Sequence, residues 1–189
     1  FRPAARQGIS VVQPLPCFGC NWDCYFGDGP CVKTLAPADV RRAVEQLLAT
    51  APGKKFTFVA IDVKTGKQKW AAETGPLLTN NWGNGPRSSP TVDGDKVYAL
   101  SGKGTLSCVN AADGKVLWKA TMEELGGKVP GWGYTESVLV DGNLVVCTPG
   151  GSKGCMAAFD KVTGAKAWQS ADWTDQAQYS SIIPVTHNG

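Results

Sequence analysis

The chain has 189 residues, of which 42% are hydrophobic, and its net charge at pH 7 is +3. A charge this small does not favour nucleic acid or a membrane surface as a partner. The sequence contains no apolar run of about 18 residues, so it predicts no transmembrane segment. What remains is a globular chain whose function has to be inferred from its motifs.

The first segment of the chain, residues 1–52, contains four closely spaced cysteines: Cys17, Cys20, Cys24 and Cys31. Three interpretations stay open. Four thiolates can bind zinc or iron, although this spacing matches neither a zinc ribbon nor a ferredoxin motif, and the single histidine, His187, is far away. The cysteines can instead form two disulfides if the segment is exported. The third interpretation is a family resemblance, given below.

The stretch "LAPADVRRAVEQLLAT" (35–50) follows the cysteines and predicts one amphipathic helix over about 37–50. Its apolar residues Val40, Val44, Leu47 and Leu48 fall on one helical face. A proline in the first turn and an aspartate near the positive end of the helix both favour this start. The breaker segment "TAPGKK" (50–55) then predicts a boundary, with a second domain over 53–189.

The second domain contains a repeat. Three segments align without a gap, each with an Asp or Asn near its start, a Thr-Gly or Asp-Gly pair, and a final tryptophan: "AIDVKTGKQKW" (60–70), "CVNAADGKVLW" (108–118) and "AFDKVTGAKAW" (158–168). The tryptophans follow one another at intervals of about 50 residues, and a period of this size with four short strands per unit is typical of propeller blades.

The front half of the unit also recurs, in "SSPTVDGDKVYAL" (88–100) and "ESVLVDGNLVVCT" (136–148), and "YSSIIPV" (179–185) resembles the opening of a further copy. Asp-Gly between two apolar runs is a strong hairpin signal. The pattern predicts strands over 57–62, 67–73, 89–92, 96–101, 105–110, 115–121, 137–141, 143–148, 155–160 and 165–170.

The predicted fold class is therefore mainly β: a partial β-propeller of four-stranded antiparallel blades, preceded by a Cys-rich loop and one α-helix. We count the last half of one unit, two complete units and the start of another. Closed propellers have about four to eight blades, so we expect this chain to be a fragment of a longer protein.

Trp70, Trp118 and Trp168 end the repeated tails, on the last strand of each unit. A large flat ring at this place can pack against the neighbouring blade. We therefore predict that the three tryptophans form the core between blades.

The loops before the first strand of each unit supply the candidate binding residues. In a propeller this strand lines the central channel, so residues that enter it can contact a ligand. Aromatic and arginine side chains are typical anchors of binding surfaces, although a Gly-Trp-Gly loop can also simply pack over a blade edge. The predicted rim for a protein or small-molecule ligand consists of Trp82, Arg87, Ser88, Trp132, Tyr134, Glu136 and Tyr179.

Residues 1–50 resemble the C-terminal end of the family-nine glycosyltransferases of the heptosyltransferase type. The resemblance rests on the Cys-rich loop, on "GPCVKTL" (29–35) and on the helix "PADVRRAVEQLL" (37–48). It implies a cytoplasmic enzyme whose cysteines stiffen a loop or bind metal. The family's sugar-nucleotide site lies in upstream segments, so no catalytic residue can be assigned here.

Residues 56–189 resemble the pyrroloquinoline-quinone-like (PQQ-like) propeller repeats, because "AIDVKTGKQKW" is similar to the tail of that family's repeat. Some members of the family are quinoprotein dehydrogenases, and others are binding scaffolds without a cofactor. The resemblance implies an exported or periplasmic propeller.

The residues favour the scaffold over the dehydrogenase. A quinoprotein site needs a calcium ion, an aspartate base and often two adjacent cysteines. This chain has no adjacent cysteine pair, and its repeat aspartates fall in turn positions. We therefore predict a non-catalytic binding or assembly scaffold without a cofactor of its own. The first alternative to the scaffold is a fragment of a PQQ-dependent dehydrogenase, whose full-length parent would bind PQQ and calcium. The second alternative is a remnant of a heptosyltransferase-type glycosyltransferase.

Overall fold

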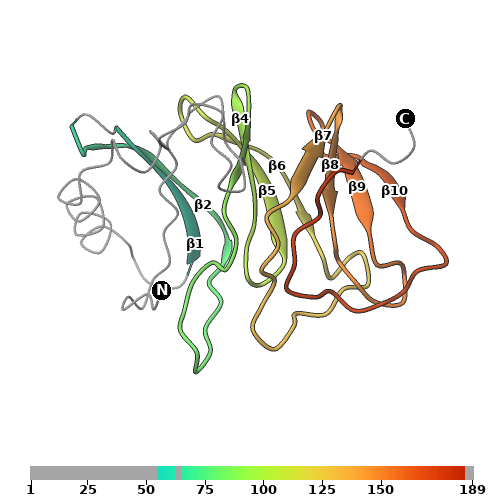
Figure 1. The fold of residues 1–189 in the computed structure, drawn as a ribbon. Coiled ribbons are helices and arrows are strands. Elements are labelled where there is room, and N and C mark those ends of the chain that lie inside the picture. Colours follow the sequence, from blue (N-terminus) through green and yellow to red (C-terminus); the bar gives the residue numbers. More distant parts are fainter. Residues whose placement is uncertain (1–54, 63–64, 186–189) are drawn as a thin grey trace.

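The computed structural model describes residues 55–62 and 65–185, and all the regular elements in this part of the chain are strands (Figure 1). The predicted Cys-rich segment, its four candidate metal ligands and the helix over 37–50 lie outside the described residues. The strands are β1 (Lys55–Ile61), β2 (Gln68–Pro76), β3 (Thr91–Asp93), β4 (Lys96–Leu100), β5 (Thr105–Asn110), β6 (Val116–Thr121), β7 (Leu139–Asp141), β8 (Leu144–Cys147), β9 (Ala157–Asp160) and β10 (Lys166–Gln169).

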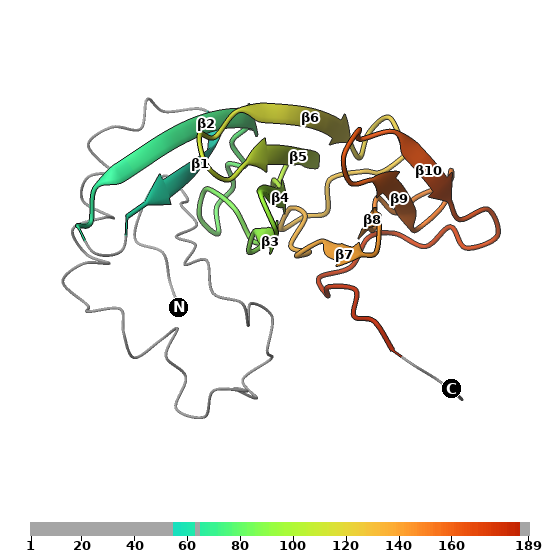
Figure 2. The same cartoon turned by 90° about the horizontal axis from the view of Figure 1, so that it is seen from above.

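The strands form three antiparallel sheets in chain order. β1 pairs with β2, the middle sheet has the order β3-β4-β5-β6, and the last sheet has the order β7-β8-β9-β10. From above, the sheets lie side by side, with β2, β6 and β10 along one rim and β3 and β7 on the inner side (Figure 2). Each four-stranded sheet is thus one propeller blade whose strands run from the inside to the outside, and the predicted fold class is confirmed.

The inner hairpins form where Asp-Gly predicts them. Asp93 pairs with Lys96 and Asp141 pairs with Leu144, so two residues make each turn. Gly94 and Gly142 open these turns with φ values of 57° and 54°. Glycine adopts such left-handed angles without strain, and turns of this kind match the twist of the paired strands.

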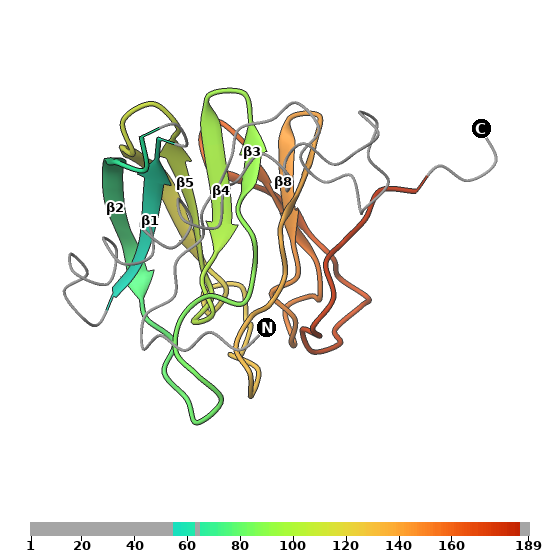
Figure 3. The same cartoon turned by 60° about the vertical axis from the view of Figure 1, so that its left-hand side comes forward.

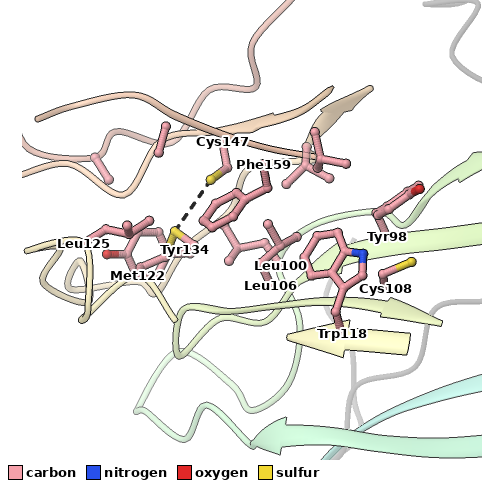
Figure 4. Packing of buried hydrophobic residues seen from close by; sticks show 14 residues of the cluster. Tyr98, Leu100, Leu106, Cys108, Trp118, Met122, Leu125, Tyr134, Cys147 and Phe159 are labelled. Atoms are coloured by element: carbon pink, nitrogen blue, oxygen red, sulfur yellow. Dashed lines mark hydrogen bonds between the residues drawn. The ribbon is translucent and has the colours of Figure 1, made fainter. Parts of the chain in front are cut away.

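The largest core cluster lies between the middle and the last sheet (Figure 4). The Trp118 ring lies 5.9 Å from the Tyr98 ring of its own sheet and 6.2 Å from the Phe159 ring of the next sheet. Its indole N–H donates a hydrogen bond of 3.1 Å to the carbonyl of Lys161, in the turn that follows β9. Trp118 therefore joins two blades through both packing and a directional contact.

Trp70 makes the equivalent contact one unit earlier. Its indole N–H donates to the carbonyl of Ala111 over 2.9 Å. A Cβ added at Gly114, in the turn of the next unit, would lie 2.5 Å from the Trp70 ring, so the ring is seated against that glycine. Trp168, predicted for the same core, is instead 41% exposed, because no described sheet follows β10.

The cysteines of the described part, Cys108, Cys147 and Cys155, are free and buried. The Cys147 thiol lies 3.9 Å from the Met122 thioether inside the same core cluster (Figure 4). The three cysteines act as small apolar residues of the packed interior. Within 55–62 and 65–185, no helix is long and apolar enough to cross a bilayer.

Candidate binding site

Three inter-blade segments gather at one end of the sheets. They are residues 77–90 between β2 and β3, residues 122–138 between β6 and β7, and residues 170–185 after β10. Figures 1 and 3 both show the first two segments below the sheets, at the end opposite the β3–β4 hairpin. Each successive unit thus presents its connecting loop on the same face of the molecule.

Each of these segments contributes one side chain to a cluster of exposed aromatic rings. Trp82 is 73% exposed, Trp132 is 53% exposed and Tyr179 is 52% exposed. The ring centroids of Trp82 and Trp132 are 5.6 Å apart, and those of Trp132 and Tyr179 are 5.9 Å apart. We call these three rings the aromatic row. It joins residues that belong to three successive units.

The loop that carries Trp82 is held by its own polar groups. The Asn80 Oδ1 atom accepts the backbone N–H of Trp82 over 3.1 Å and one Arg87 Nη2 hydrogen over 3.3 Å. Arg87 Nη2 also donates to the carbonyl of Gly83 over 2.7 Å. Arg87, predicted as a rim anchor, is half-buried, and its hydrogen bonds stabilise the conformation of this loop.

The loop that carries Trp132 packs directly on the preceding unit. Gly133 has a φ of +84°, and a Cβ at this position would lie 2.4 Å from Leu78 Cδ2. The next residue, Tyr134, donates its backbone N–H to the carbonyl of Gly102 over 3.0 Å. Only glycine fits this close approach, and the approach brings Trp132 beside Trp82.

Tyr134 was predicted at the rim, but the structure places it in the core. It is 2% exposed, and its hydroxyl donates to the carbonyl of Pro149 over 2.9 Å. Burial raises the pKa of this phenol well above its usual value. The reason is the reversal at Gly133, after which Tyr134 turns into the space between two blades.

Glu136 was also predicted at the rim and is instead 2% exposed. Its carboxylate accepts the Thr148 backbone N–H over 2.7 Å and the Thr148 hydroxyl over 3.0 Å. Burial raises the pKa of Glu136 to about 7, although both hydrogen bonds act in the opposite direction. At the equivalent place one unit earlier, the Ser88 hydroxyl donates to the carbonyl of Leu100 over 2.7 Å. Both side chains thus hydrogen-bond the segment before the first strand of a unit to the end of its second strand.

A chain of serine contacts joins the units at their inner side and was not predicted. The backbone N–H of Ser89 donates to the Ser137 hydroxyl over 3.0 Å, and the backbone N–H of Ser137 donates to the Ser181 hydroxyl over 2.9 Å. The signal was visible in the sequence, since serine recurs at this place in each unit. These contacts fix the spacing of the loops that carry the aromatic row.

The repeat aspartates act within turns and between blades. Asp62 and Asp160 accept the backbone N–H of Thr65 and Thr163 through Oδ1, at 2.8 and 2.7 Å. Asp93 pairs with Lys161 of the next unit, with 2.8 Å between Oδ2 and Nζ. In the described ranges, no three acidic, histidine or cysteine side chains converge as a metal site would require.

The family described as outer membrane protein assembly factor BamB matches residues 54–187 of the chain. The tetrathionate hydrolase of Acidithiobacillus ferrooxidans is 31% identical over an alignment of 152 residues, and the match covers 75% of this chain and 28% of that protein. The resemblance of residues 1–50 to glycosyltransferases lies outside both the family match and the described residues, and it stays a prediction.

Among solved structures, BamB from Moraxella catarrhalis is 22% identical with a TM-score of 0.43, and the likeness covers 62% of this chain and 31% of that one. A quinohemoprotein alcohol dehydrogenase from Comamonas testosteroni is 24% identical with a TM-score of 0.43, covering 58% of this chain and 17% of that one. The chain thus spans less than a third of the length of each of these relatives.

Proposed function

The chain belongs to the outer membrane protein assembly factor BamB family, and on this premise we propose that it is a non-catalytic scaffold whose aromatic row binds a polypeptide partner. The observation that carries the proposal is the row itself. Three large aromatic side chains from three units are at least half exposed and contact one another. Contiguous apolar surface of this kind marks an interaction site, and tryptophan and tyrosine are common anchors there.

The contacts that hold the loops of the aromatic row in place favour a binding role over a catalytic one. Arg87 and the glycine turn at Gly133 hold the two tryptophan loops in place. A binding surface that is already ordered loses little conformational entropy when the partner arrives. The repeat aspartates Asp62 and Asp160 cap turns, and Asp93 pairs with the next blade. These contacts support a structural role for the acidic residues of the described segment.

We place the protein outside the cytoplasm. The description of the family refers to the assembly of outer membrane proteins, which supports an exported location and a protein as the partner. The cysteines of residues 1–52 then belong to an oxidising compartment, where they can pair as disulfides. This location opposes the cytoplasmic one that the resemblance of residues 1–50 to glycosyltransferases implies.

A peptide array tests the proposal. Overlapping 15-residue peptides that cover outer membrane β-barrel proteins and the soluble domains of their assembly machinery are probed with the purified chain. We expect a small set of peptides to bind, and Trp132→Ala to abolish their binding. Trp173→Ala is the matched control, because Trp173 is similarly exposed at 48% but lies outside the row, with its indole N–H bonded to Asp175.

Two results would contradict the proposal that the chain is a non-catalytic scaffold. One is an array on which Trp132→Ala binds the same peptides as the unaltered chain. The other is a melting temperature that rises when PQQ and calcium are added together, since a ligand that binds only the folded state stabilises it by mass action. The second result would favour the dehydrogenase.

A further inference from the structure

Glu136 is a buried carboxyl group without a cation beside it. Its side chain is 2% exposed, and the hydrogen bonds that it accepts come from Thr148. Among the residues that the structure describes, no basic side chain forms an ion pair with it. The titratable groups near it are Tyr134 on its own loop, Cys147 on β8 and Cys155 in the loop before β9. A negative charge on Glu136 is therefore not compensated by a positive one.

The position of Glu136 within the repeat is neutral in the neighbouring units. Repeat alignment places Ser88 before β3 and Ser180 after β10 at the same position. The hydroxyl of Ser88 reaches the carbonyl of Leu100 in its own unit, a contact that carries no charge. The fold thus needs only a small polar group here. The unit of β7 to β10 has an ionisable group instead, so its junction with the following segment can respond to pH.

Glu136 lies on the loop that carries the centre of the aromatic row. Trp132 precedes it by four residues, and the Trp132 ring lies 5.9 Å from the Tyr179 ring. The next residue, Ser137, donates its backbone N–H to the Ser181 hydroxyl over 2.9 Å. Two contacts between residues 131–138 and the segment after β10 therefore lie on either side of the buried carboxyl group in the sequence.

The charged form of Glu136 has a short way to water. Its partner Thr148 also lines an open cavity of about 540 Å³, together with Ser180 and Ser181 of the segment after β10. A carboxylate is favoured by hydration, so its ionisation favours conformations that water from this cavity can reach. The neighbouring Thr135 hydroxyl is buried without a hydrogen-bond partner in the described part of the chain. The loop thus holds a second polar group that gains from hydration.

We propose that ionisation of Glu136 opens the contact between residues 131–138 and residues 178–182 and thereby takes the aromatic row apart. In the neutral form the carboxyl group stays buried, and the three rings remain in contact. In the charged form water reaches the carboxylate, the contact of Ser137 with Ser181 breaks, and Tyr179 leaves Trp132. The inference rests on the proposed function for what the row binds, and it adds the regulation of that same site by pH.

The direction and the size of this response follow from two pKa values. Burial raises the pKa of Glu136 from 4.5 to about 7 when the contact is closed, and hydration returns it toward 4.5 when the contact is open. Because the closed form has the higher pKa, it is favoured at low pH and loses its advantage as the pH rises through 7. Between pH 6 and pH 8, one group of this kind can raise the ratio of open to closed contacts by about tenfold.

Backbone hydrogen exchange of the full chain, followed by NMR at pH 6, 7 and 8, tests the proposal without a partner. The reporter is the Ser137 N–H, which donates to the Ser181 hydroxyl. The matched control is the Ser89 N–H, because it makes the same contact one unit earlier, beside the neutral Ser88. The amides of β5 report unfolding of the whole chain. All rates are corrected for the intrinsic effect of pH on exchange.

We expect the protection of the Ser137 N–H to fall by about tenfold between pH 6 and pH 8 and to stay below that of β5. The protection of the Ser89 N–H should change by less than about twofold, as for a contact without a titrating group. In Glu136→Gln the protection of Ser137 should not depend on pH. Glu136→Ser, with the residue of the neighbouring units, is a second neutral variant and should behave in the same way.

Three outcomes would overturn the inference. Protection of Ser137 that does not change with pH, or that changes equally in both neutral variants, would show that Glu136 does not control the contact. Equal changes at Ser137, Ser89 and β5 would show that the whole chain unfolds and that no local opening occurs. The proposed function fails separately: if Ser137 responds as expected and the peptide array shows no binding, only the polypeptide partner is refuted.

Discussion

Replacing Glu136 with glutamine should change how stability depends on pH. Glu136 is 2% exposed, and burial raises the pKa of its carboxyl from 4.5 to about 7. Because the pKa in the folded chain is higher than in the unfolded chain, folding favours the protonated form. The stabilisation that this gives is complete below about pH 4.5 and is lost as the pH rises through about 7.

The size of the change in stability follows from the pKa shift of Glu136. Each pKa unit corresponds to about 1.4 kcal/mol, so the free energy of unfolding should fall by about 3 kcal/mol between pH 4.5 and pH 8 because of this one group. Glutamine keeps the shape of the side chain. Its carbonyl can accept the Thr148 backbone N–H, and the Thr148 hydroxyl can rotate to accept the new amide. The variant should therefore fold without the pH-dependent loss.

The assay is urea unfolding of both chains at half-unit steps from pH 4.5 to pH 8. Exposed groups such as Asp95 and Asp160, whose pKa values are lowered by their hydrogen bonds, act in the opposite direction but equally in both chains. The difference between the two curves thus isolates Glu136. Parallel curves for the unaltered chain and Glu136→Gln would refute the reasoning.

Two further predictions concern the contacts between blades. Trp118→Ala should cost about 3–5 kcal/mol in urea unfolding, as expected for a buried aromatic truncation. Trp168→Ala, at an equivalent but 41% exposed ring, should cost clearly less, and equal losses would contradict the difference in packing. Gly164→Ala should lower the unfolding midpoint strongly, because the residue has a φ of +73° and its Cβ would lie 2.6 Å from the Trp118 ring. Gly142 has a φ of +54° and open space around it, so Gly142→Ala should lower the free energy of unfolding by only about 1–2 kcal/mol. A larger loss for Gly142→Ala would show that the contact with the Trp118 ring is not the cause of the loss in Gly164→Ala.

The strand positions were predictable because they depend on local signals. β5 falls where the apolar run predicts it, and the two hairpins turn at Asp-Gly. The prediction for β9 started at residue 155, but the strand begins at Ala157. The backbone N–H of Cys155 donates instead to the carbonyl of Trp173 over 2.6 Å. A partner this far along the chain has no signature in the local sequence.

The candidate site was predictable only in part. Repeat alignment identified Tyr179, and the loops before the aligned strands identified Trp82 and Trp132, but the sequence could not show that the rings touch, since this depends on the rotation between successive units. The same reasoning grouped Tyr134 and Glu136 with them, whereas both are buried. Alignment gives the position of a residue within a unit. The direction of its side chain was decided by the contact of Gly133 with the preceding unit.

The seating of Trp70 and Trp118 on the turn glycine of the following unit has a consequence for how such proteins change in evolution. Trp70 meets Gly114, and Trp118 meets Gly164. Every contact of this kind links one repeat to the next and to no other. A duplication that copies one whole repeat therefore supplies its own ring and its own glycine, and both new borders are complete. A duplication of half a repeat leaves a ring without its glycine or a glycine without its ring. Repeats of this family should thus be gained and lost as whole units, and substitutions at the tryptophan and at the glycine one unit later should be inherited together.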